Sequence, residues 1–214
     1  MSSTPERILR YPSDVAFTPT VKAAQERLGS RELYARMERD RGWGVALTPD
    51  IKAFIEAQTS AFLGTANTEG QPYIQHRGGP AGFLHVLDEN TIAFTDFIGN
   101  QQYITLGNLQ DNPKVILFLI DYTQRIRIKL WGTARVVEND PELLAQLADP
   151  TYRSHPERAI VITLTAWDRN CPQHIQRRYP QSMVAPLIDH LKTHIAALEQ
   201  QIRSLGAEPV AATN

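Results

Sequence analysis

The clearest pattern of apolar positions lies near the C-terminal end of the chain, where branched aliphatic residues recur at alternating spacings of four and three. They are Val184, Ile188, Leu191, Ile195, Leu198, Ile202 and Leu205. This heptad seam is typical of a helix that packs against one other helix, and its division into isoleucine and leucine positions favours two strands. We predict a helix over residues 179–206, ended by Gly206, whose seam faces either a second chain or the chain's own body. Residues 207–214 are expected to be a loose tail.

A different pattern fills the middle of the chain, where short runs of apolar and β-branched residues are bounded by turn residues. The predicted strands are Ser60–Ala66, Tyr73–Gln75, Phe83–Leu87, Thr91–Thr95, Val115–Ile120, Ile126–Val137 and Arg158–Trp167. The polar break at residues 88–90 joins the third and fourth runs as a hairpin. The sequence therefore predicts an antiparallel meander of strands.

Shorter helices are predicted before and between these strands. Thr18 and Thr48 each precede a proline, the order of an N-cap and a first helical residue, so helices are expected over 19–41, with a break at Gly29, and over 49–58. Two more are expected over 101–110 and 141–147. Charged residues crowd the first helical segment and are expected to form a solvated face. Helices followed by a meander indicate an α+β fold, and no strand leads into the glycine-rich turn of a dinucleotide-binding fold.

Composition narrows the function classes. A chain of 214 residues with 42% apolar and 21% charged residues can bury a core as one domain. A formal charge of -1, with acids interleaved among the bases, gives no sign of a nucleic-acid partner. No apolar run is long enough to cross a bilayer, and the first residues lack the apolar core of a signal peptide, so we expect a cytoplasmic protein. The single Cys171 excludes an internal disulfide and is expected to be a plain small residue.

Two polar stretches that contain glycine, residues 76–80 and 96–102, are the candidate functional turns. Arg77 precedes Gly78 and Gly79, where a positive φ and a close approach of a ligand to the backbone are sterically permitted. An arginine there could grip a phosphate through two hydrogen bonds. From these residues alone, a glycine-rich turn with a solvated arginine is the favoured alternative.

A second anion site is suggested at the helix predicted to follow Asn100. If that helix begins near Gly99 and Asn100, its unpaired N–H groups could hold a phosphate, although an asparagine-capped helix explains the same residues. Farther along, Arg125, Arg127 and Lys129 alternate with apolar residues and are expected to share one face of a strand. Either an anion or solvent could compensate this row of like charges.

Four segments in a fixed order resemble one known family. RGGPAGFLHVLD, TDFIGNQQ, LGNLQDNPKVILFLID and RIKLWGTARVV are similar to the FMN-binding split-barrel family related to pyridoxamine 5'-phosphate oxidase. The resemblance implies an antiparallel split β-barrel over 59–178, packed by an N-terminal extension with helices over 1–58, in one domain with the C-terminal helix. It also implies a homodimer with FMN near the interface.

The resemblance implies a flavin oxidoreductase of unknown substrate, acting on a nicotinamide or a small organic molecule. A non-catalytic flavin- or haem-binding protein of the same fold is the alternative. No catalytic side chain is assigned, and no metal site is expected, because Cys171 and His174 have no second pair of ligands nearby. Gln101 and Gln102 stand where the oxidase has cations for the phosphate. The implied cofactor-binding residues are Gln75, His76, Arg77, Gly78, Thr95, Asp96, Gly99, Asn100, Gln101, Gln102, Arg127 and Lys129, the last two near the pyrimidine edge of the flavin.

Overall fold

The computed structural model describes residues 10–150, 152, 156–170 and 172–209 of the chain. The chain divides into two compact units. The first comprises residues 1–121 and 126–173, and the second comprises residues 122–125 and 174–214. Cys171 and the end of the predicted tail lie outside the described residues.

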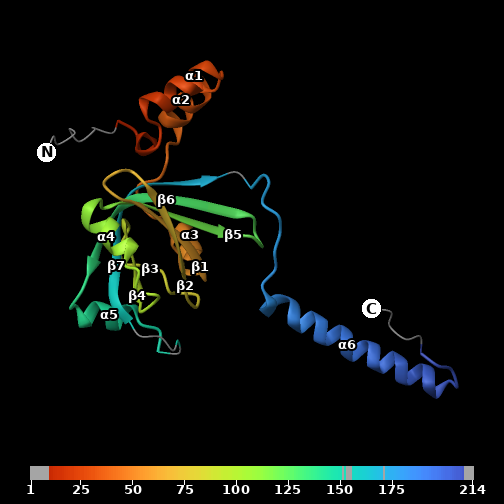
Figure 1. The fold of residues 1–214 in the computed structure, drawn as a ribbon. Helices are drawn as coiled ribbons and strands as arrows, with labels where there is room; N and C mark the ends of the chain where they lie inside the picture. Colours follow the sequence, from red (N-terminus) through yellow and green to blue (C-terminus); the bar gives the residue numbers. More distant parts are fainter. Residues whose placement is uncertain (1–9, 151, 153–155, 171, 210–214) are drawn as a thin grey trace. The chain divides into compact units, whose positions relative to one another are not determined.

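The first unit contains an antiparallel sheet of seven strands in the order β2-β1-β5-β6-β7-β4-β3 (Figure 1). With its helices, it is an α+β fold of the split β-barrel type, as the sequence predicted. The strands are β1 (Ser60–Ala66), β2 (Pro72–Gly78), β3 (His85–Val86), β4 (Thr91–Phe97), β5 (Lys114–Asp121), β6 (Ile126–Val137) and β7 (Pro156–Asn170). The predicted hairpin is β3 with β4, where His85 pairs with Ala93.

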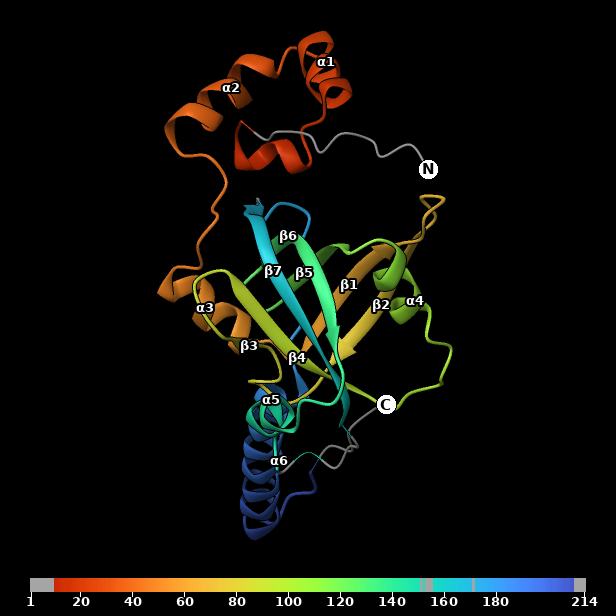
Figure 2. The same cartoon turned by 90° about the vertical axis from the view of Figure 1, so that its left-hand side faces the viewer.

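Alternation along the strands separates a core face from an outer face. In β1, β5 and β6 every second residue is buried, as in Leu63, Leu117 and Leu130, each fully inaccessible. Helix α3 (Pro49–Glu56) packs on this core through Ile51 and Ile55. Helix α4 (Ile104–Asp111) contacts β1, and α5 (Pro141–Leu147) contacts β4 (Figure 2).

The segment before α3 contains a 3-10 helix η1 (Pro12–Val15), α1 (Pro19–Arg27) and α2 (Arg31–Asp40). The Thr18 hydroxyl accepts from the Val21 N–H at 3.2 Å, and Gly29, with φ +77°, separates α1 from α2 as predicted. The predicted solvated face is only partly correct. Glu38 is buried. Its carboxylate accepts a hydrogen bond from the Ser13 hydroxyl and forms ion pairs with Lys22 at 3.4 Å and with Arg31, which compensate the burial of its charge.

Three predicted boundaries around the candidate turns were wrong. Strand β2 continues through residues 76–78, and β4 continues through Asp96 and Phe97, so the polar residues there belong to strands rather than turns. Helix α4 begins at Ile104, later than expected. Gln101 and Tyr103 have φ of 58° and 54°, which a right-handed helix does not accommodate.

The second unit contains the long helix α6 (Gln181–Ser204), which stops just before Gly206 at φ +78°, as the sequence predicted. The centroid of the Tyr122 ring lies 4.5 Å from the guanidinium carbon of Arg178. The Thr123 hydroxyl donates a hydrogen bond to the backbone carbonyl of Arg178 at 3.1 Å. Among the helices in the described part of the chain, none combines the length and apolar character that a membrane crossing needs.

Candidate functional site

A polar cavity of about 300 Å³ opens at the ends of β2 and β4. Tyr73, Gln75 and Arg77 line it from β2, because every second side chain of a strand points to the same face. Asp96 and Phe97 of β4 and Glu157 and Arg158 of β7 form another part of its wall. The rest is formed by the loop after β4 and the first turn of α4: Gly99, Asn100, Gln101, Gln102, Tyr103, Ile104, Thr105 and Leu106.

Asp96 joins two arginines in the wall of this first cavity. Its carboxylate oxygens lie 2.5 Å from Nη1 of Arg77 and 3.5 Å from Nη1 of Arg158. Arg158 is 7% exposed and also forms ion pairs with Glu157 at 2.6 Å and Glu138 at 3.2 Å. Burial lowers the pKa of Arg158, but Glu157 and Asp96 outweigh that effect and raise it, so the guanidinium stays charged.

One hydrogen-bond donor in the wall of the first cavity lacks an acceptor among the described residues. The Nε atom of Arg77 is buried and has no hydrogen-bond partner in the described part of the structure. A buried N–H without a partner is costly, and such groups are uncommon in native proteins. A ligand that accepts a hydrogen bond from this donor would therefore gain binding free energy.

The loop between β4 and α4 brings further backbone donors to the first cavity. The side chain of Asn108 in α4 donates to the Thr65 hydroxyl of β1 at 2.9 Å, a buried bond that fixes the helix on the sheet. The first N–H groups of an α-helix have no partner within it, and they carry partial positive charge. Because Ile104, Thr105 and Leu106 line the cavity, this positive end lies at its wall.

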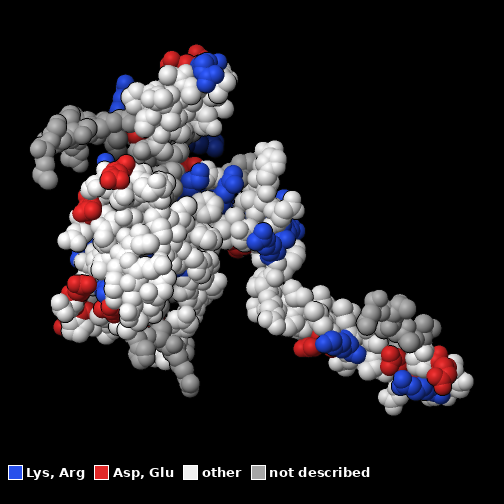
Figure 3. All heavy atoms as spheres, in the orientation of Figure 1, with Lys and Arg blue, Asp and Glu red and all other residues white. Residues whose placement is uncertain are grey.

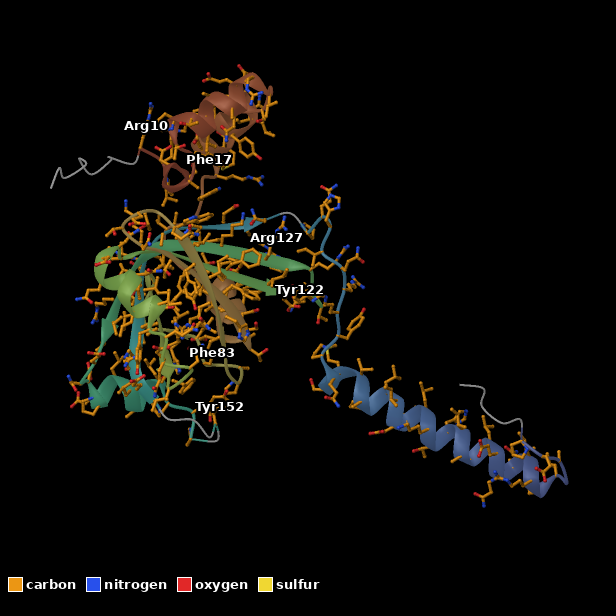
Figure 4. The ribbon with its side chains drawn as sticks, viewed as in Figure 1. Arg10, Phe17, Phe83, Tyr122, Arg127 and Tyr152 are labelled. Atoms are coloured by element: carbon orange, nitrogen blue, oxygen red, sulfur yellow. The ribbon has the colours of Figure 1, made fainter. Side chains whose placement is uncertain are left out.

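A second cavity of about 270 Å³ adjoins the same end of β4, and Phe97 lines both cavities. Its wall is mostly apolar, and the Phe97 and Tyr152 rings lie 5.5 Å apart between centroids. Phe83 and Tyr152 reach it from different loops (Figure 4). The lining residues are Pro80, Ala81, Gly82, Phe83, His85, Thr95, Phe97, Leu147, Ala148, Asp149, Pro150 and Tyr152.

A family model described as pyridoxamine 5'-phosphate oxidase matches residues 47–196, which is most of the chain and all of the sheet. The chain belongs to this family. A comparison with curated proteins finds no match.

Several solved structures are also similar to this chain. HupZ from Group A Streptococcus is 20% identical, with a TM-score of 0.47, over 62% of this chain and 98% of HupZ. An FMN-binding protein from Syntrophomonas wolfei is 15% identical, with a TM-score of 0.44, over 71% of this chain and 95% of that protein. General stress protein 26 from Bacillus anthracis is 16% identical, with a TM-score of 0.38, over 54% and 87% of the two chains. The family assignment rests on the sequence match and not on these structures.

Within the oxidase fold, the structure brings seven of the predicted site residues to one place. Gln75, Arg77, Asp96, Gly99, Asn100, Gln101 and Gln102 all line the first cavity. Thr95 lines the second cavity instead, and its hydroxyl donates to the Leu147 carbonyl at 3.5 Å. The prediction missed Arg158, Tyr103 and Glu157. The only sequence signal for Arg158 is an arginine at the start of a long apolar strand.

His76, Gly78, Arg127 and Lys129 lie on the outer face of the sheet, opposite Arg77. Residues paired across an antiparallel sheet share a face. One row runs from β2 to β7 through His76, Phe62, Phe118, Lys129 and Asp168. Figure 4 shows Arg127 well apart from Phe83 and Tyr152. In one chain, therefore, these residues and the first cavity are on different sides of the sheet.

The outer cations belong to a polar cluster of β6 and β7. Lys129 pairs with Asp168 in register, and Arg127 pairs with Asn170. Burial raises the pKa of Asp168, and Lys129 and a hydrogen bond from Asn170 only partly oppose that shift. Arg125 does not join them, contrary to the predicted row of three cations, because it has φ +56° in the turn before β6.

Proposed function

We propose that this protein is an FMN-dependent oxidoreductase that holds the FMN phosphate in the first cavity. The observation that carries the proposal is the buried Nε–H of Arg77, which lacks a partner in the described structure and lies in a cavity wall with the N-terminal end of α4. A phosphate oxygen would satisfy this donor through a charge-assisted hydrogen bond. Family membership, which covers all of this wall, gives independent support.

The first cavity suits a phosphate because its donors are fixed before the ligand arrives. The charges of Arg77 and Arg158 are balanced by Asp96 and Glu157, so attraction comes from directed N–H groups rather than from excess positive charge. Helix N-termini and unsatisfied backbone amides bind phosphates in this way. Gln101 and Gln102 then need not be cations for the site to bind the anion.

The second cavity suits the planar ring of the flavin. Phe83, Phe97 and Tyr152 provide flat apolar surfaces, and Phe97 is shared with the cavity proposed for the phosphate. When bound, FMN supplies the transfer of electrons, and the chain's own residues bind it, orient it and exclude water. Thr95 and His85 are among the side chains of this wall that can hydrogen-bond to polar atoms at the ring edge.

The outer sheet face suits a second copy of the chain. Phe62 and Phe118 lie 6.4 Å apart on it, and Ile74 at its edge is 69% exposed. An exposed apolar patch of this kind needs a cover, and a two-fold pair would cover both copies with the same patch. Arg127 and Lys129 also lie on this face, and we propose that in a homodimer they contact the flavin held by the partner.

Anaerobic reduction of the FMN-loaded protein tests the activity. NADH, NADPH and pyridoxamine phosphate represent the nicotinamide and small organic substrates, and each is mixed with the protein while flavin absorption is followed. Bleaching by at least one of them, faster than bleaching of free FMN, is the expected result. If none bleaches the bound flavin faster, the protein is a flavin-binding protein without this activity.

A further inference from the structure

The heptad seam of α6 is uncovered along most of its length. None of the described side chains of α6 is buried. Val184 is half-buried, and the seam residues from Ile188 to Leu205 are 36% to 80% exposed. On the face of α6 that is seen in Figure 3, charged residues lie between stretches of uncharged surface. A stripe of branched aliphatic residues on a surface marks an interaction site, because water is unfavourable against it.

The seam has the residue distribution of a two-stranded coiled coil. Isoleucine occupies each a position, at Ile188, Ile195 and Ile202. Leucine or valine occupies each d position, at Val184, Leu191, Leu198 and Leu205. Isoleucine at a with leucine at d favours parallel dimers over larger assemblies. Pro186 falls at an f position, on the opposite side of the helix, so the seam continues past it.

We propose that α6 pairs in parallel, and in register, with α6 of a second copy of this chain. The residues beside the seam fit this pairing, because they place one polar contact and one apolar contact across it. In a parallel pair, a g residue meets the e residue five positions later on the partner. His194 at g therefore meets Glu199 of the partner subunit, and Leu187 meets the aliphatic stem of the partner's Lys192.

A parallel helix pair has a two-fold axis along its length, which is the symmetry of a homodimer with equivalent surfaces. The helix pairing extends the proposed homodimer to a second surface, and its seam and flanking charges do not depend on FMN. The two proposals can therefore fail separately.

Disulfide trapping in the full chain tests the pairing. The background is Cys171→Ser, which removes the native thiol. In it, Ile195→Cys places one thiol at an a position, where the two chains face each other in a parallel pair. The matched control is Thr193→Cys, an exposed f position. Under mild oxidation we expect Ile195→Cys to form a covalent dimer on a non-reducing gel, at least ten-fold faster than Thr193→Cys.

Three results would overturn the pairing. Equal rates for the two variants would mean random collision, and no covalent dimer from Ile195→Cys would mean that the seam is covered by something else. Antiparallel helices would instead crosslink a mixture of Ile195→Cys and Leu198→Cys chains to each other. A circular-dichroism spectrum equal to that of the parent chain shows that each variant has folded, and FMN binding, measured separately, reports on the flavin site.

Discussion

At the scale of single residues, Arg77 is the side chain on which the proposed flavin site depends. It is held by Asp96 at 2.5 Å, and its buried Nε–H has no partner in the described part of the chain. Arg77→Ala should weaken FMN binding by about 1.5–3 kcal/mol, or roughly 10- to 150-fold, because a charge-assisted contact is lost. Riboflavin, which has no phosphate, should bind with nearly unchanged affinity. Fluorescence titration with both ligands measures the difference.

The matched control for Arg77 is Arg135→Ala. Arg135 is exposed on β6 and lines neither cavity, so its loss should change neither affinity. If Arg77→Ala weakened FMN and riboflavin equally, the arginine would not contact the phosphate.

Asp14 allows a prediction about pH. Burial raises its pKa, but the hydrogen bonds from Lys22 and from the Tyr11 and Arg10 N–H groups outweigh burial and hold the pKa below its usual value. Such a carboxyl stabilises the fold above the unfolded-state pKa of about 4, and this stabilisation is lost as the pH falls through the lower folded-state value. Asp14→Asn should therefore lower the free energy of unfolding at neutral pH.

Urea unfolding at several pH values measures this effect of Asp14. The deficit of Asp14→Asn should shrink as the pH falls below about 4, because the wild-type carboxyl then becomes neutral as well. Asp189→Asn, at an exposed position of α6, serves as the control and should show little change. A deficit that stays constant with pH would show that the charge of Asp14 is not what stabilises this segment.

At the residue scale, sequence reasoning selected two stretches that meet at one cavity, but it did not predict how their side chains are arranged. The stretches around Arg77 and Asn100 do meet, since both line the first cavity. His76 and Arg77 were placed together in one turn, whereas a strand sends them to opposite faces. Arg158 is about 80 residues away from Arg77 in the chain, and only the pairing of β4 with β7 brings it to Asp96. No local pattern contains that pairing.

At the scale of elements, local periodicity predicted most of the structure. The bounds of β1, β6 and α5 agree with the prediction, because their alternation or capping residues are contained within the element itself. The errors occur where the long-range sheet extends a strand, as in β2 and β4, or where positive φ angles delay a helix, as in α4.

Two glycines provide a matched test of element packing. A Cβ atom at Gly132, where β6 bulges, would lie 2.2 Å from the Thr163 carbonyl oxygen, whereas one at Gly107 in α4 would meet nothing within 4 Å. Gly132→Ala should lower the free energy of unfolding by about 1–3 kcal/mol through overpacking. Gly107→Ala should raise it by about 0.5–1 kcal/mol, because alanine favours a helix. Urea unfolding of both variants measures these changes. A more stable Gly132→Ala variant, or a less stable Gly107→Ala variant, would contradict this account of β6 and α4.

At the scale of the whole molecule, the chain has two surfaces that could pair it with a copy of itself. They belong to different compact units, the outer sheet face to the first and α6 to the second. Deleting residues 181–214 should leave a dimer that still binds FMN, held by the sheet face, with a weaker association than the full chain. Sedimentation velocity and flavin fluorescence measure both properties.

The same deletion identifies which surface dominates. Adding Phe118→Glu to the deleted chain should yield a monomer, because a carboxylate would be buried in the proposed sheet interface. Val45→Glu, an equivalent change at a half-exposed position outside the sheet, should leave the dimer intact. A deleted chain that is a folded monomer without flavin would make α6 the element that forms the dimer.

The visible absorption spectrum of the purified protein, with identification of any ligand released on denaturation, tests the central claim most directly. The account predicts flavin bands and the release of FMN rather than FAD, because we propose that the first cavity holds one terminal phosphate. A Soret band would indicate haem in place of the flavin. A colourless protein that also fails to bind FMN added at micromolar concentration would contradict the account.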